Sequence, residues 1–224
     1  MQHYISILLG QINEQKQRHK LQLMHVLKKY LPPVAVEYCS ELIMLHNLHL
    51  HIEIERKDRL GDYSPHLGKG NRISINHNLS PYDFLITFIH ELAHHTAYVK
   101  YGQKHAPHGT EWKSEFKAHM RTIVMAGFFP PDVAEPLIQH MKRPAYTHSG
   151  DVELTRALLK YDKREVNMLQ DLPSGVAFKM SKKSRIVLVK GERMKKKYCC
   201  TDINTGRLYL VHEGAVVIPI NKSK

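Results

Sequence analysis

The segment from residue 80 to residue 100, SPYDFLITFIHELAHHTAYVK, limits most strongly what this chain can fold into. Its pattern predicts one helix, because Ser80 suits the N-cap, Pro81 the first helical position and Asp83 the first turn, where a carboxylate favours the helix dipole. The apolar residues inside it cover a wide part of its surface: Phe84, Leu85, Phe88, Ile89, Leu92 and Ala93. We therefore expect a buried helix at the centre of the fold.

This helix carries an H-E-x-x-H motif made of His90, Glu91 and His94. Residues four apart lie on one helical face, so both imidazoles point toward the same place. Glu91 projects from the adjacent turn toward the position of a metal-bound water, which is typical of zinc hydrolases that use glutamate as general base. The alternative is a core helix whose histidines are satisfied by hydrogen bonds, but buried polar clusters of this kind are more often functional.

A catalytic zinc needs a third protein ligand, and the spacing excludes two ways of supplying it. The longer metzincin pattern fails, because Ala97 and Tyr101 occupy the positions of its glycine and its last histidine. His95 follows His94 directly and points about 100° away around the helix, so the two cannot bind the same ion. The third ligand must therefore come from farther along the chain.

The downstream candidates for this ligand are His105, His108, Glu111, Glu115 and His119. We favour His108, because it precedes a helix in a loop long enough to fold back, and Gly109 permits a close approach. Glu111 stays open as the alternative ligand. With His108 as the ligand, Glu111 is instead the candidate carboxylate that orients a histidine ring. His119 lies on the packing stripe of the next helix and is expected to be structural.

Periodicity predicts further helices and two short strands around this motif. Residues 48–55, LHLHIEIE, alternate apolar and polar side chains, so they form a half-buried strand with His49 and His51 on its solvated face rather than at a metal. Residues 60–70 are rich in glycine and are expected to form a loop. The expected helices are 4–30, 34–45, 110–127, 132–141 and 151–161, and the second expected strand is 72–76.

The character of the chain changes near residue 171, where short strands replace helices. Turns are expected at Gly191, at residues 204–206 and at Gly214. The expected strands are 176–180, 185–190, 197–201, 207–211 and 215–220. Twelve Lys and Arg residues against four Asp and Glu give this last quarter most of the formal net charge of +12. We therefore expect two domains, residues 1–170 and a basic β-rich module at residues 171–224, with nucleic acid as a candidate partner.

The 224 residues have the composition of a soluble globular protein, at 42% hydrophobic and 24% charged residues. No run is apolar enough to span a membrane, and the N-terminal sequence lacks the basic region and cleavage site of a signal peptide. Three cysteines, Cys39, Cys199 and Cys200, do not make a disulfide framework. We expect a cytoplasmic monomer in which Cys39 is a small buried hydrophobic residue.

The H-E-x-x-H motif at residues 90–94, followed by HGTEWK at residues 108–113, resembles the SprT-like family. That family includes Spartan, a protease of DNA–protein crosslinks, and the bacterial SprT proteins. Its second element is H-G-x-x-[FW], whose histidine is the third zinc ligand. The resemblance covers roughly residues 30–127 and implies that His90, His94 and His108 bind zinc while Glu91 is the catalytic base.

The C-terminal module departs from this family, many of whose members end in a zinc ribbon with two C-x-x-C pairs. Here Cys199 and Cys200 are adjacent, and two neighbouring cysteines cannot complete a tetrahedral site alone. We therefore expect either a degenerate ribbon without metal or an unrelated small barrel.

Together these features predict an α+β fold: a zincin-like metalloprotease domain, with helices and a small antiparallel sheet, followed by the β-rich module. The expected function is a zinc-dependent metalloendopeptidase whose candidate substrates are proteins associated with or crosslinked to DNA. The strands before the helix would hold a substrate in extended form, and Tyr98 or Tyr101 could stabilise the oxyanion. The alternatives are a non-catalytic, zinc-stabilised nucleic-acid-binding or regulatory protein and a zinc hydrolase of other bonds.

Overall fold

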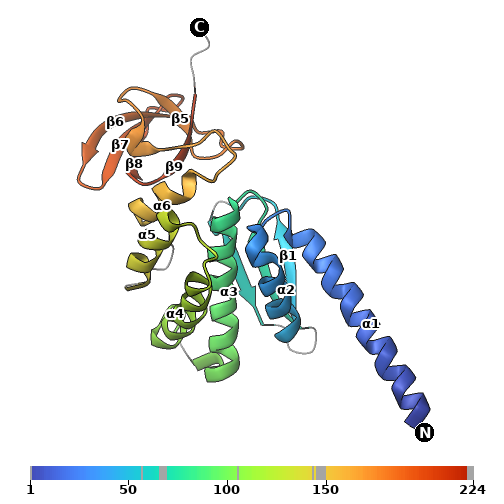
Figure 1. Cartoon of the computed structure of the whole chain (residues 1–224). Coiled ribbons are helices and arrows are strands. Elements are labelled where there is room, and N and C mark those ends of the chain that lie inside the picture. The colour runs from blue at the N-terminus through green and yellow to red at the C-terminus, as the bar shows by residue number, and fades with distance from the viewer. Residues whose placement is uncertain are drawn as a thin grey trace. The chain divides into compact units, whose positions relative to one another are not determined.

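The computed structural model describes residues 2–56, 58–65, 70–104, 106–142, 144 and 150–220, and it is an α+β protein. His105 and residues 66–69 of the expected loop lie outside the described residues. The chain divides into two compact units, Met1–Phe129 and Pro130–Lys224 (Figure 1). In the described part of the chain, no helix is both long and apolar enough to cross a membrane.

The first unit begins with two helices joined by a proline-containing turn. They are α1 (Gln2–Leu27) and α2 (Val36–Leu45), with the short 3-10 helix η1 (Pro33–Ala35) before α2. Both helices confirm the sequence prediction to within three residues at each end. Leu27, Ala35 and Cys39 are fully buried where these elements meet, so Cys39 is the small buried residue that the sequence suggested.

A three-stranded sheet follows, made of β1 (Leu48–Glu53), β2 (Gly61–Ser64) and β3 (Asn71–Asn76) in the order β1-β3-β2. The expectation of an antiparallel sheet was wrong: β1 runs parallel to β3, and β2 runs antiparallel to it. The expectation of a loop over residues 60–70 was also wrong at β2. This strand is only four residues long, and its sequence GDYS has no apolar alternation from which a strand could be predicted.

The predicted central helix is α3 (Pro81–Tyr101), which lies between the sheet and α4 (Thr110–Met125) (Figure 1). Its start is as predicted: Pro81 opens the helix, and the N–H of Asp83 donates to Ser80 Oγ at 3.3 Å. A short 3-10 helix, η2 (Gly102–Lys104), follows it. The buried stripe of α4 also confirms the sequence pattern and consists of Trp112, Phe116, Met120 and Ile123.

The second unit starts with α5 (Pro131–Lys142) and α6 (Val152–Leu159) and continues as a six-stranded antiparallel sheet. Its elements are β4 (Asn167–Met168), η4 (Leu169–Asp171), β5 (Ala177–Lys179), β6 (Leu188–Met194), β7 (Lys197–Asp202), β8 (Leu208–His212) and β9 (Val216–Pro219), and the strand order is β4-β9-β5-β6-β7-β8. All five expected strands are present. Their buried side chains form one core: Leu169, Leu172, Phe178, Leu188, Cys200 and Val217.

Two expectations about this unit need correction. The sheet does not begin after residue 171, because β4 pairs with β9 and Leu169 belongs to its core, so the module starts earlier than predicted. Gly191 does not form a turn, since β6 continues through it. A Cβ at Gly191 would lie 2.3 Å from the Cys199 carbonyl oxygen, so glycine permits a close approach to β7 instead.

Candidate metal centre

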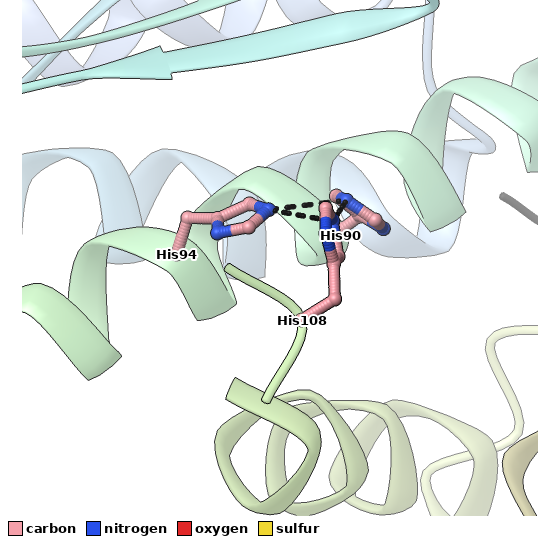
Figure 2. A group of neighbouring side chains, drawn as sticks. All are labelled: His90, His94 and His108. Atoms are coloured by element: carbon pink, nitrogen blue, oxygen red, sulfur yellow. Dashed lines mark hydrogen bonds between the residues drawn. The ribbon is translucent and has the colours of Figure 1, made fainter. Parts of the chain in front are cut away.

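Three histidine rings meet beside α3 (Figure 2). His90 and His94 come from one face of that helix, and His108 comes from the segment just before α4. The Nε2 atom of His108 is 3.0 Å from the Nε2 atoms of both His90 and His94, which are themselves 3.3 Å apart. The sequence predicted this trio, and the structure brings all three together.

The three nitrogens fit a zinc ion. Zn–N bonds of about 2.0–2.1 Å in a tetrahedron place ligand nitrogens roughly 3.3–3.4 Å apart, close to the observed separations. Hydrogen bonds among three Nε2 atoms that face one point need a proton between each pair, and three neutral imidazoles cannot all supply one there. A single cation at that point accepts a lone pair from each ring. Three protein ligands leave a fourth tetrahedral position for water or substrate, as in catalytic rather than structural zinc sites.

A turn of unusual backbone conformation directs His108 toward the helix. The N–H of Gly109 donates to the Ala106 carbonyl at 2.9 Å, with Pro107 and His108 as the two central residues. His108 has a φ of 58°, and a proline followed by a positive φ is the pattern of a type II turn. A Cβ at Gly109 would lie 2.9 Å from the Ala106 oxygen, so the glycine makes the tight turn possible.

Trp112 forms an aromatic wall behind the histidines. It is fully buried, and its ring centroid lies 4.7 Å from that of His90, 5.4 Å from that of His94 and 4.6 Å from that of His108. Its Nε1–H donates to the His90 carbonyl at 3.3 Å, and Phe116 stacks on its other side. A large rigid ring in contact with all three histidines restricts their orientations.

Glu91 points away from solvent, into the space between α3 and β2. Its side chain is 6% exposed, and a Cβ on Gly61 would lie 2.6 Å from its Oε1 atom. Burial, aided by the nearby Asp62 carboxylate, raises the pKa of Glu91 to about 8. The positive charge of Arg56 and the main-chain N–H of Tyr63, which donates to the Glu91 carboxylate, oppose this rise.

A second polar contact, between Tyr63 and His95, joins strand β2 to α3. The Tyr63 hydroxyl lies 3.3 Å from Nδ1 of His95 and 3.2 Å from Oδ1 of Asn71. His95 is buried, so the residue that cannot reach the metal instead holds the strand that touches Glu91. Its burial lowers the pKa of His95 to about 4, so this contact is made by a neutral imidazole.

The remaining sequence candidates lie elsewhere or stay untested. Glu115 pairs with Lys100 at 3.0 Å, and His119 lies 3.2 Å from the Thr96 hydroxyl. Among the described residues, Glu111 makes no hydrogen bond to the three histidine rings. Its carboxylate nevertheless lies near the His108 turn, since a Cβ added at Gly109 would be 3.4 Å from Oε2 of Glu111. Its role in orienting a ligand stays a prediction, as does the role of either tyrosine.

Gly61 and Tyr63 are the residues around Glu91 that the sequence did not reveal. Both act at β2 through the main chain: one lacks a side chain where Glu91 packs, and the other offers an N–H group. Comparisons of this chain with protein-family models, with curated proteins and with solved structures found no match.

Proposed function

We propose that this chain is a zinc-dependent metalloendopeptidase, as its resemblance to the SprT-like family implies. The observation that carries the proposal is the convergence of three Nε2 atoms, from His90, His94 and His108, next to the helix that also carries the buried Glu91. A purely structural zinc site would need a fourth protein ligand and would have no use for a buried carboxyl at that position.

In this function the three histidines hold the ion, which when bound supplies a Lewis acid and lowers the pKa of water. Glu91 takes a proton from the attacking water and passes it to the leaving amine. A carboxyl whose pKa lies near neutrality both accepts and returns a proton readily, and the burial of Glu91 moves its pKa in that direction.

A protein is the substrate class that the family resemblance implies, and β2, which contacts Glu91, is the outer strand of its sheet. The N–H of Asn76 donates to the Leu60 carbonyl, which fixes the alternation of the β2–β3 ladder. The main-chain groups of Gly61 and Tyr63 therefore face away from β3, on the side where Glu91 binds. Glu91 takes the outward N–H of Tyr63, so a peptide that added to this edge as a further strand would compete with Glu91 for that group.

DNA is the proposed second partner, bound by the basic C-terminal part of the chain. Its support is the concentration of Lys and Arg in residues 171–224. Phosphate contacts by such side chains bind DNA without reading its sequence. This arrangement would bring the peptidase to proteins that are associated with DNA.

The test compares the full chain with Glu91→Gln after both are loaded with one equivalent of zinc. We expect the wild type to cleave a denatured protein such as casein, and the variant to lose at least about a hundredfold in rate with its zinc retained. Cleavage by both proteins at the same rate would contradict the role of Glu91. Zinc binding without cleavage by either, with or without DNA, would instead favour the non-catalytic alternative.

A further inference from the structure

Strand β8 carries apolar side chains on both faces of its sheet. Tyr209 and Val211 of β8 pack against the core of the second unit. Leu208 and Leu210 alternate with them on the opposite face, where they are 70% and 58% exposed. A sheet with one face on the core normally has a polar outer face, so large exposed apolar residues indicate a contact surface.

Strand β8 also lies at the end of its sheet, with β7 as its neighbour on one side. The N–H of Asp202 donates to the Arg207 carbonyl, which identifies the hydrogen-bonded pairs of the β7–β8 ladder. By alternation, the N–H and C=O groups of Leu208 and Leu210 point away from β7. The same residues therefore offer apolar side chains and main-chain hydrogen bonds to an added strand.

The two ends of this edge are positively charged. Exposed Arg207 precedes β8, and exposed Lys197 of β7 lies opposite His212, the last residue of β8. Lys195 and Lys196, in the turn between β6 and β7, are exposed as well. Among the described residues 188–212, the exposed carboxylate is that of Glu192. A second copy would bring like charges together, whereas an acidic segment would complement them.

The side chains of this surface favour a protein over a nucleic acid. Single-stranded nucleic acids stack their bases on aromatic rings, but Leu208 and Leu210 are aliphatic. We propose that β8 receives, as an added strand, an extended segment of a partner protein with apolar residues at its centre and acidic residues at both ends. This inference does not depend on the metal centre.

The probe for this proposal is a fluorescent synthetic peptide in which valine alternates with threonine between aspartate-rich ends. A second peptide carries lysine at its ends instead. Measured by anisotropy with the full-length protein, the acidic peptide is expected to bind at least about tenfold more tightly than the lysine peptide. Equal affinities for the two peptides, or no binding of either, would overturn the proposal.

Leu210→Pro tests the hydrogen bonds of the edge, because the N–H that it removes points away from β7 and the internal ladder is retained. Leu210→Lys keeps this N–H and adds charge, and it serves as a second variant if the proline disturbs folding. Both are expected to weaken acidic-peptide binding by about tenfold or more. The matched control is Met180→Lys, also exposed but outside β8, which should stay within about twofold of wild type.

Two further outcomes would assign the surface to another occupant. Concentration-dependent self-association that Leu210→Pro abolishes, without binding of the acidic peptide, would identify a second copy of the chain. Displacement of the bound peptide by a single-stranded oligonucleotide in wild type, with loss of oligonucleotide binding in Leu210→Lys, would identify nucleic acid. Either result would overturn the assignment to an acidic protein segment.

Discussion

Among the three histidines of the candidate metal centre, His108 is the one that α3 does not supply. Its positive φ is uncommon for a residue with a side chain, although histidine tolerates it better than most. Backbone strain of this kind persists when the surroundings fix it, here through the Ala106–Gly109 turn and contact with Trp112. The turn and the contact with Trp112 therefore hold His108 close to the other two histidines.

His108→Ala is expected to lower zinc affinity by at least about a hundredfold, since two ligands hold the ion much less tightly than three. The control is His119→Ala, which removes a half-buried histidine of α4 that bonds Thr96 instead. Trp112 is the single tryptophan of the chain, so its fluorescence can follow zinc binding directly. Undiminished affinity in His108→Ala would show that the third ligand lies elsewhere.

Glu91 makes the stability of the metal-free protein depend on pH. Its pKa is about 8 in the folded state, against an ordinary value of 4.5, so between these pH values the folded state keeps a proton that the unfolded state has lost. The free energy of unfolding should therefore fall as pH rises from 4.5 to about 8. Above about pH 8, the titration of Glu91 should change it little. Below pH 4.5 both states are protonated, and the penalty is absent.

Glu91→Gln removes this titration. In the presence of a chelator, we expect the variant to gain stability relative to wild type as pH rises from 4.5 to 8. The gap should reach a few kcal/mol, because each pH unit between the two pKa values is worth about 1.4 kcal/mol. Urea unfolding across this range measures it. Parallel pH profiles for the two proteins would contradict a raised pKa at Glu91.

At the scale of elements, β2 links the sheet to the motif helix. It contacts Glu91 through Gly61 and the Tyr63 N–H, and it is held in place by His95. The sequence predicted α3 well, because its cap, proline and apolar face all agree. The sequence did not predict β2, because this short strand has no apolar alternation. It is held by its pairing with β3 and by the Glu91 side chain, which are tertiary contacts.

Gly61→Ala tests this link, because the new methyl group would lie 2.6 Å from Oε1 of Glu91 and 2.8 Å from Cγ2 of Thr87. We expect the free energy of unfolding to fall by about 1–3 kcal/mol through overpacking. Peptide cleavage should fall at least about tenfold with zinc content unchanged, since Glu91 is displaced and the histidines are not.

The matched control is Gly150→Ala, where a Cβ would meet nothing within 4 Å. Differential scanning calorimetry, metal analysis and a cleavage assay on the two variants separate stability, binding and catalysis. Wild-type cleavage by Gly61→Ala would mean that the packing of Glu91 against β2 does not position the base.

At the scale of the whole molecule, the candidate metal centre and the basic strands belong to different units. The three histidines and Glu91 lie in Met1–Phe129, whereas the basic strands lie in Pro130–Lys224. Composition predicted the basic strands but not the start of their unit. The short strand β4 and the residues of α5 and α6 have no change in charge that marks a boundary, and only their tertiary contacts assign them to this unit.

If the second unit binds DNA, its affinity should depend steeply on salt, because bound lysines and arginines release counterions from the phosphates. Charge reversal at the β6–β7 turn, by Lys195→Glu with Lys196→Glu, should weaken duplex binding and reduce the slope of log affinity against log salt. Zinc content should not change. Binding that is absent, or unaffected by salt, would remove DNA from the proposed partners.

Zinc K-edge X-ray absorption of the full-length chain tests the metal centre most directly. We predict one zinc per chain with three imidazole nitrogens and one further light ligand at about 2.0–2.1 Å, and no sulfur near 2.3 Å. That result would establish a site with three protein ligands and an open position, as catalysis requires. Sulfur scattering, a fourth imidazole or the absence of stoichiometric zinc would contradict the site formed by His90, His94 and His108.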